Sequence, residues 1–138
     1  MAIGFFVDPI FYTIGMGDFL NSFFSTIYIK LEKSEWGSKY PIIMNDLYSG
    51  IIKKEKMNDA LIELETLKNH LAKFSPKDIV WDFENLNALP PWGNNISSEI
   101  TDLSNYFVTS EGEDLLDVLK KAMNTSIEID EDLVIENI

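Results

Sequence analysis

The sequence predicts an α+β fold, in which a small mixed or antiparallel sheet packs against about four helices. Two short apolar runs rich in strand-forming residues open the chain. Longer segments follow in which apolar residues recur at the i, i+3, i+4 spacing of an amphipathic helix. Strands and helices do not alternate regularly, which argues against a parallel β-α-β arrangement. With 138 residues, the chain is expected to form one domain over residues 1–138.

The first two elements are expected to be strands, followed by a long helix. Residues 2–7 (AIGFFV) and 11–14 predict two strands with a tight connection at Asp8-Pro9. Asp18 is the expected N-cap of the first helix. The helix runs on through the strand-forming residues TIYI, where the length of the 3.6-residue periodicity decides for helix. Its apolar stripe consists of Leu20, Phe23, Phe24, Ile27, Tyr28 and Leu31.

Two further helices are expected in the middle of the chain. After a loop at residues 36–40, a short helix begins at Pro41 and stops at Gly50. A third helix starts near Asn58 and ends at Pro76. The expected apolar residues are Ile42, Ile43, Leu47 and Tyr48 in the shorter helix and Leu61, Leu64, Leu67, Leu71 and Phe74 in the longer one, with Glu63, Glu65 and Lys68 outside.

The alternation in DIVWDFE predicts a half-buried strand over residues 78–84. A loop follows at 85–95, then a short helix over 96–103 and a strand over 106–109. In the strand over 78–84, Ile79, Trp81 and Phe83 share one face, while Val80, Asp82 and Glu84 share the other.

The last helix is predicted from its local signals. The sequence SEGE at residues 110–113 matches a capping box, in which a serine and a glutamate satisfy backbone donors at a helix start. Lys120-Lys121 suits the last turn, since the helix dipole favours cations there. The tail from Ile127 to Ile138 is expected to add a final strand.

Composition excludes several classes of function. The chain is 46% hydrophobic, yet no run approaches the roughly 18 apolar residues that a membrane span needs. No basic region precedes the first apolar run, so a secretory signal is not expected. The absence of cysteine excludes disulfides and thiolate chemistry. A cytoplasmic location is the simplest interpretation.

The charge is distributed unevenly. Residues 1–74 contain nine acidic residues and eight lysines, whereas residues 75–138 contain fourteen acidic residues and three lysines. Every basic residue is a lysine, so no arginine offers bidentate phosphate recognition. Direct nucleic-acid binding is therefore disfavoured. An acidic face suits a basic partner, although acidity also serves solubility alone.

Catalytic and metal-ligating constellations find little support. His70 is the only histidine, and there is no cysteine to join it in a triad or a zinc site. A surface or structural role is expected for it. Asp82 and Glu84, on one face of the predicted strand, form the one candidate acid/base or metal pair, but paired acids on a solvated strand face are common. No catalytic residue, metal or cofactor is predicted.

Trp92, in a Pro-Pro-Trp-Gly loop, has two interpretations. It is a candidate exposed anchor for a protein partner, because tryptophan is enriched in binding hot spots. The favoured alternative is that it folds back over one end of the core. The same question arises for Trp36, for which core packing is favoured more strongly.

Five motifs taken in order resemble the immunity protein 70 family of bacterial polymorphic toxin systems. The resemblance runs from about Phe19 to about Leu119, and it is weaker in the N-terminal strands and the acidic tail. The motifs are FFSTIYIKLE, WGSKYPIIMNDLYSG, VWDFE, PPWG and SNYFVTSEGEDL.

The resemblance implies a small cytoplasmic α+β protein that binds the C-terminal domain of a cognate toxin and blocks it without catalysis. Toxins of such systems are often nucleases with basic substrate-binding faces, which an acidic surface would mimic or occlude. It transfers no catalytic position and leaves the oligomeric state open. Two alternatives remain: an acidic regulatory or adaptor domain for a basic protein, and a hydrolase using Asp82 and Glu84. The candidate toxin-binding residues are Asp82, Glu84, Trp92, Asp102, Glu111, Glu113 and Asp114.

Overall fold

A four-stranded antiparallel sheet forms one layer of the computed structural model, which describes residues 3–15, 17–93 and 95–137. The strands are β1 (Ile3–Val7), β2 (Ile10–Gly15), β3 (Ile51–Ile52) and β4 (Leu133–Asn137), in the order β2-β1-β4-β3. The α+β prediction is confirmed. The expected N-terminal hairpin is present, with Val7 paired to Ile10 across the turn at Asp8-Pro9, while the predicted strand residue Ala2 lies outside the described part.

The tail does form a strand, and it lies in the middle of the sheet. β4 pairs with β1 on one side and with β3 on the other. Residues 127–129 of the expected strand belong to the preceding helix, and Ile138 lies outside the described residues. β3 was not predicted from the sequence, since two residues carry too little periodicity.

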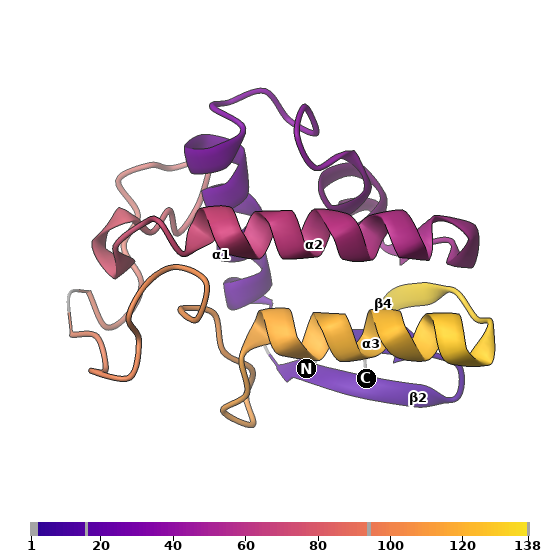
Figure 1. Ribbon diagram of the computed structural model, residues 1–138. Coiled ribbons are helices and arrows are strands. Elements are labelled where there is room, and N and C mark those ends of the chain that lie inside the picture. The colour runs from indigo at the N-terminus through magenta and orange to yellow at the C-terminus, as the bar shows by residue number, and fades with distance from the viewer. Residues whose placement is uncertain (1–2, 16, 94, 138) are drawn as a thin grey trace.

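Helices cover the sheet in a second layer. Helix α3 (Leu115–Ile129) packs against β1 and β2, and α2 (Met57–Leu71) runs alongside α3 (Figure 1). Helix α1 (Asp18–Thr26) continues without a break into a π-helical segment, η1 (Ile27–Leu31). The strand-forming residues TIYI are therefore helical, as the periodicity predicts. Gly17 rather than Asp18 occupies the N-cap, and Asp18 lies in the first turn, where the helix dipole favours an acid.

The predicted apolar stripes meet in one continuous core. In α1 and η1 the stripe residues other than Tyr28 are buried, and α3 also buries an apolar stripe. The shorter predicted helix is also present, as the π-helical segment η2 (Ile42–Leu47) with Pro41 at its N-cap. Its predicted apolar residue Tyr48 is an exception, since it is 48% exposed. The buried stripe residues of the last helix are Leu115, Leu116, Val118, Leu119 and Ala122.

A buried carboxylate organises the WGSKYP loop between η1 and η2. The Glu32 side chain is 2% exposed and accepts the backbone N–H groups of Gly37 at 2.9 Å, Lys39 at 3.0 Å and Tyr40 at 3.0 Å. Gly37 has a φ of +75°, which favours glycine, and a Cβ there would lie 2.6 Å from the Asn45 side chain. The loop is thus fixed by one acid and one glycine.

Trp36 and His70 both have structural contacts in this region. The indole N–H of Trp36 donates to the Met44 carbonyl at 2.8 Å, in agreement with the favoured core-packing interpretation. His70 Nδ1 forms a hydrogen bond with the Tyr40 hydroxyl. Burial, and then the negative charges of Glu32 and Glu63, raise the pKa of Tyr40, which favours its protonated form.

The sequence predicts Glu63 on the outer side of α2, and this prediction is wrong. It is half-buried and accepts the N–H groups of Ile42 and Ile43 at 3.1 Å, at the start of η2. Burial raises the pKa of this carboxyl despite those two hydrogen bonds. Helical spacing alone predicts an outward position for Glu63, because it contains no information about η2, whose first N–H groups need an acceptor.

The predicted capping box at Ser110 is wrong. Asp114 occupies the N-cap of α3, and Ser110 instead donates its backbone N–H to the Ile14 carbonyl at 2.9 Å. Thr109 closes a turn before the helix, where its hydroxyl accepts the N–H groups of Glu111 at 3.3 Å and Glu113 at 3.2 Å. The helix also extends beyond Lys120-Lys121. A capping box does occur at Ser75 and Asp78, at the short 3-10 helix η4 (Pro76–Asp78).

Candidate functional site

Residues 79–114, which we call the irregular segment, connect η4 to α3 at one end of the molecule, on the left in Figure 1. The predicted strands at 78–84 and 106–109 and the predicted helix at 96–103 are wrong. In the described residues of the segment, the one backbone pairing of strand type is an isolated bridge between Val108 and Asp114. Long loops without their own secondary structure in a compact domain are commonly functional. All seven candidate binding residues lie on this segment.

Helix α1 holds the beginning of the segment through buried hydroxyl groups. Thr26 Oγ1 both donates to the Val80 carbonyl and accepts the Val80 N–H, each at 3.2 Å. Ser22 donates to the same carbonyl at 2.8 Å, and Ser25 accepts the Phe83 N–H at 3.0 Å. These side chains replace the strand partner that the alternating pattern suggested. The sequence does carry a signal for this contact, because Ser22, Ser25 and Thr26 share one helix face at the i, i+3, i+4 spacing.

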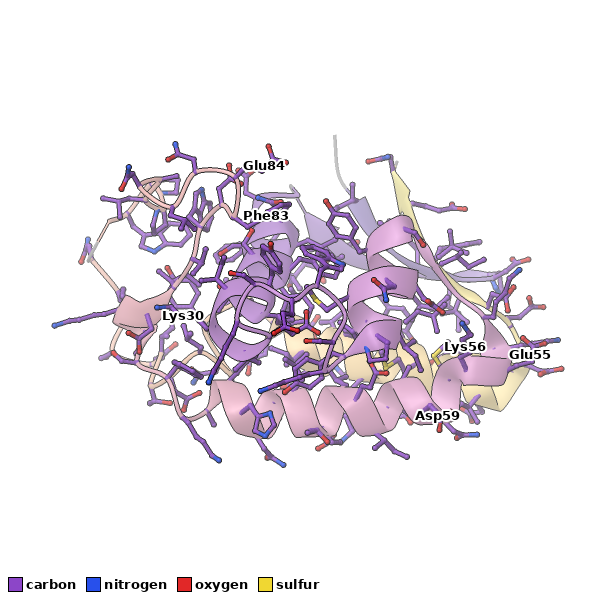
Figure 2. All side chains as sticks on the ribbon, turned by 90° about the horizontal axis from the view of Figure 1, so that it is seen from above. Lys30, Glu55, Lys56, Asp59, Phe83 and Glu84 are labelled. Carbon is purple, nitrogen blue, oxygen red and sulfur yellow. The ribbon has the colours of Figure 1, made fainter. Side chains whose placement is uncertain are left out.

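The predicted pairing of Asp82 with Glu84 on one strand face is therefore absent. Val80, expected on the solvated face, is the most buried residue of this stretch at 8% exposure. Asp82 Oδ1 accepts the backbone N–H of Glu84 at 3.0 Å and so stabilises a turn. Glu84 is exposed and points away from the body of the molecule, whereas Phe83 packs against Tyr28 and Trp36 (Figure 2). The geometric basis for an acid/base pair is lost.

Trp92 folds back onto the core, as the favoured interpretation predicted. Its ring stacks on Phe19 with centroids 5.3 Å apart and an interplanar angle of 25°. Its indole N–H donates to the Tyr106 hydroxyl at 3.0 Å. Trp81 packs edge-on against Trp92, with centroids 5.4 Å apart. Trp92 remains only half-buried, so one part of the ring lines the surface.

Asp102 is directed into its own turn. Its carboxylate accepts the Ser104 N–H at 2.8 Å, the Ser104 hydroxyl and the Thr101 hydroxyl, the last at 3.1 Å. Burial acts to raise the pKa of this carboxyl, but the hydrogen bonds outweigh that effect and lower it. Asp102 is thus a negative charge at the surface whose orientation is fixed by the turn.

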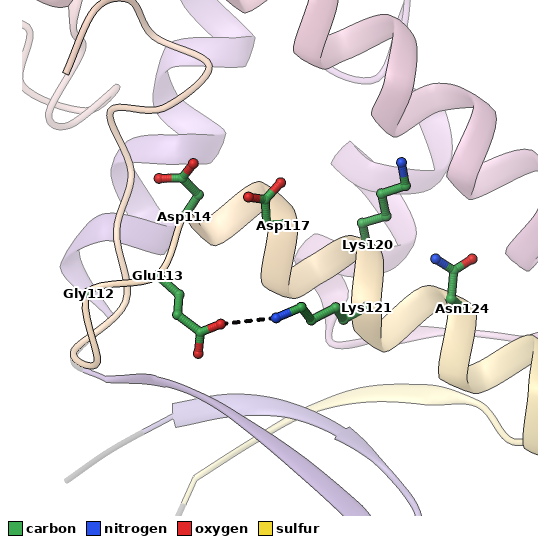
Figure 3. Close-up of a pocket in the computed structure, with 7 residues that line it drawn as sticks. All are labelled: Gly112, Glu113, Asp114, Asp117, Lys120, Lys121 and Asn124. Atoms are coloured by element: carbon green, nitrogen blue, oxygen red, sulfur yellow. Dashed lines mark hydrogen bonds and ion pairs between the residues drawn. The ribbon is translucent and has the colours of Figure 1, made fainter. Parts of the chain in front are cut away.

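Glu113 and Asp114 come together in a shallow polar hollow of about 470 Å³ over the first turns of α3 (Figure 3). Glu113 forms an ion pair with Lys121 at 3.2 Å. Burial, and then the charge of Asp117, raise the pKa of Asp114, while Lys68 opposes the shift. Glu111 is exposed and lines a neighbouring hollow together with Glu113. The structure therefore brings three of the candidate residues together: Glu111, Glu113 and Asp114.

The charged side chains of the irregular segment itself all have one sign. Every ionisable side chain between Lys77 and Lys120 is an aspartate or glutamate, apart from tyrosine. Seven of the fourteen acidic residues of the C-terminal half lie on this irregular chain at one end of the molecule. A surface of this kind attracts basic partners by long-range steering.

Within the described residues, no helix combines the length and the apolar character needed to cross a bilayer. Nor do three histidine, aspartate or glutamate side chains of these residues gather in a way that would hold a metal ion.

The chain matches the family model described as Immunity protein 70 over residues 5–135, which spans the fold from β1 to β4. The chain belongs to the immunity protein 70 family. No curated protein and no solved structure matches it. The match includes the N-terminal strands and most of the tail, where the resemblance of the sequence motifs is weaker.

The Immunity protein 70 motifs fall into two structural groups. WGSKYP is the loop that Glu32 holds, and FFSTIYIKLE supplies the hydroxyl groups that bind Val80 and Phe83. VWDFE, PPWG and most of SNYFVTSEGEDL belong to the irregular segment itself. The first group positions the second. The feature that sequence reasoning missed is the cluster of Phe19, Trp81, Trp92 and Tyr106, because its members are far apart in the sequence.

Proposed function

We propose that this protein binds and neutralises the C-terminal domain of a cognate polymorphic toxin by stoichiometric, non-catalytic occlusion in the cytoplasm of the producing cell. Membership of the Immunity protein 70 family supports a toxin as the partner. One observation supports the proposed binding mode: acidic side chains and half-buried aromatic residues occur together on the irregular segment.

The proposed partner surface is basic, as on the substrate-binding face of a nuclease. An acidic face steers such a partner into contact, and its carboxylates take the place of nucleic-acid phosphates. Glu84 and Glu111 are exposed and belong to the steering charge. Asp82 and Asp102 also hold turns of the segment, so they set its shape as well as its charge.

Co-expression with the C-terminal domain of the toxin encoded beside this chain's gene tests the proposal. We expect growth to be restored against this toxin and not against a related non-cognate toxin, and a 1:1 complex to be recovered from the rescued cells. The non-cognate toxin controls for general effects on expression.

If both folded partners are present and neither rescue nor a complex is found, the immunity proposal is wrong. An acidic regulatory or adaptor domain for a different basic protein then becomes the better account.

A further inference from the structure

Trp92 separates two apolar hollows on the irregular segment. One has a volume of about 240 Å³ and the other about 350 Å³. Phe19, Trp92 and Val108 line both, so they form a shared wall between them. The other apolar residues that line them are Ile14, Trp81 and Pro91 in the first and Ile96, Ile100 and Tyr106 in the second.

The shared wall is fixed before any partner arrives. Trp92 is held by stacking on Phe19 and by its hydrogen bond to Tyr106, and Trp81 packs against its edge. Swinging Trp92 outward to insert into a partner would break these contacts. A partner that enters the hollows instead would meet aromatic walls already in place, without the entropic cost of ordering them.

One acidic residue lines these hollows, and three others are sequence neighbours of lining residues. Asp18 lines the first hollow, and Asp82 and Glu111 directly follow its lining residues Trp81 and Ser110. Glu99 directly precedes Ile100, which lines the second hollow. An apolar centre with an acidic rim fits a segment in which an apolar side chain is flanked by basic ones.

Exposed leucines add to the apolar surface of the same loop. Leu86 is 64% exposed and Leu89 is 74% exposed, and Leu89 lies two residues before Pro91, which lines the first hollow. Both leucines add exposed apolar surface to the segment that carries the hollows.

We propose that the two hollows beside Trp92 receive an aromatic or long aliphatic side chain of the toxin domain, which is flanked there by lysine or arginine residues. Trp92 is then the wall of a receptor pocket rather than an inserted anchor. The inference rests on the proposed function, because it takes the toxin domain as the partner.

Two variants fill the hollows from exposed positions. Asn95→Trp places a large side chain at the second hollow and Ser110→Trp at the first. Ser98→Trp adds the same side chain at an exposed position on the same loop that lines neither hollow, and it is the matched control. We expect the double variant Asn95→Trp/Ser110→Trp to weaken binding of the toxin domain about 30-fold or more, mainly through faster dissociation, as for loss of a hot spot. The control is expected to bind within about 3-fold of the original protein.

A second measurement keeps the original sequence and so does not depend on the variants folding. The protein has three tryptophans, and labelling with 5-fluorotryptophan gives each its own fluorine resonance. We expect unlabelled toxin domain to shift the resonances of Trp81 and Trp92 at saturation. Trp36, which packs in a separate cluster with Tyr28 and Tyr48, is the internal reference.

The outcomes separate this inference from the proposed function. If the original protein neutralises the toxin while the filled variant binds normally, or while Trp81 and Trp92 show no shift, the pocket assignment is overturned and the immunity function stands. Shifts that grow with the concentration of the protein alone would assign the hollows to a second copy of the chain and overturn the inference. Absence of any toxin binding by the original protein overturns both.

Discussion

Replacing Glu32 with alanine is expected to lower the free energy of unfolding by about 3–5 kcal/mol. The carboxylate is 2% exposed and accepts three backbone N–H groups, of Gly37, Lys39 and Tyr40. Alanine leaves these donors without their acceptor in a largely water-excluded site, and each buried orphan costs about 1–3 kcal/mol. Urea denaturation monitored by circular dichroism measures the change.

Glu35→Ala is the matched control for this substitution. Glu35 is exposed and lies in the same loop, so its removal is expected to change stability by no more than about 0.5 kcal/mol. Equal midpoints for the two variants would show that the Glu32 carboxylate does not hold the loop. Glu32→Gln is expected to be intermediate, because one amide oxygen replaces two carboxylate oxygens.

Reversing the exposed charges of the irregular segment is expected to slow association with the toxin domain about 10-fold or more at low ionic strength. The double variant Glu84→Lys/Glu111→Lys alters side chains that are exposed, and it spares Asp82 and Asp102, which hold turns. Loss of steering also makes the association rate less dependent on salt, while the dissociation rate changes little. Stopped-flow or surface-based kinetics over a range of salt concentrations measures this.

Glu128→Lys/Glu136→Lys makes the same change in net charge on α3 and β4, away from the irregular segment. A local steering mechanism predicts a much smaller effect for this control. If both double variants slow association equally, the total charge of the protein and not the irregular segment governs the encounter.

The elements that can be predicted from the sequence are those with long, local hydrophobic patterns. The stripe from Leu20 to Leu31 predicted a helix through residues that favour strands, because burial of a continuous apolar face outweighs intrinsic propensity. The hairpin at Asp8-Pro9 and the C-terminal strand were also predicted. The pairing of β4 between β1 and β3 was not, since it depends on contacts between distant parts of the chain.

The errors concentrate in the irregular segment. The alternation at 78–84 reads as a strand, yet its backbone bonds to hydroxyl groups of α1, a long-range contact that periodicity does not encode. The SEGE signature is typical of a capping box, but the Glu113 N–H is bonded to Thr109 and the Ser110 N–H to the Ile14 carbonyl, and the helix starts at Leu115. Local rules failed where tertiary contacts take over the backbone hydrogen bonds.

The candidate site was predicted in composition but not in shape. Its acidity and Trp92 were visible in the sequence, and all seven candidate residues lie on one segment. The two hollows arise from Phe19 on α1 meeting Trp81, Trp92 and Tyr106 from the segment. Residue spacing within a single helix or strand does not predict a cluster that joins distant parts of the chain.

Hydrogen–deuterium exchange of the protein alone and in its 1:1 complex with the toxin domain tests the central claim most directly. The account predicts that protection on binding is concentrated in residues 79–114, with the strongest effect in peptides that contain Trp81 and Trp92. Protection confined to the exposed side of α2 or to the strand edges, with residues 79–114 unchanged, would contradict it.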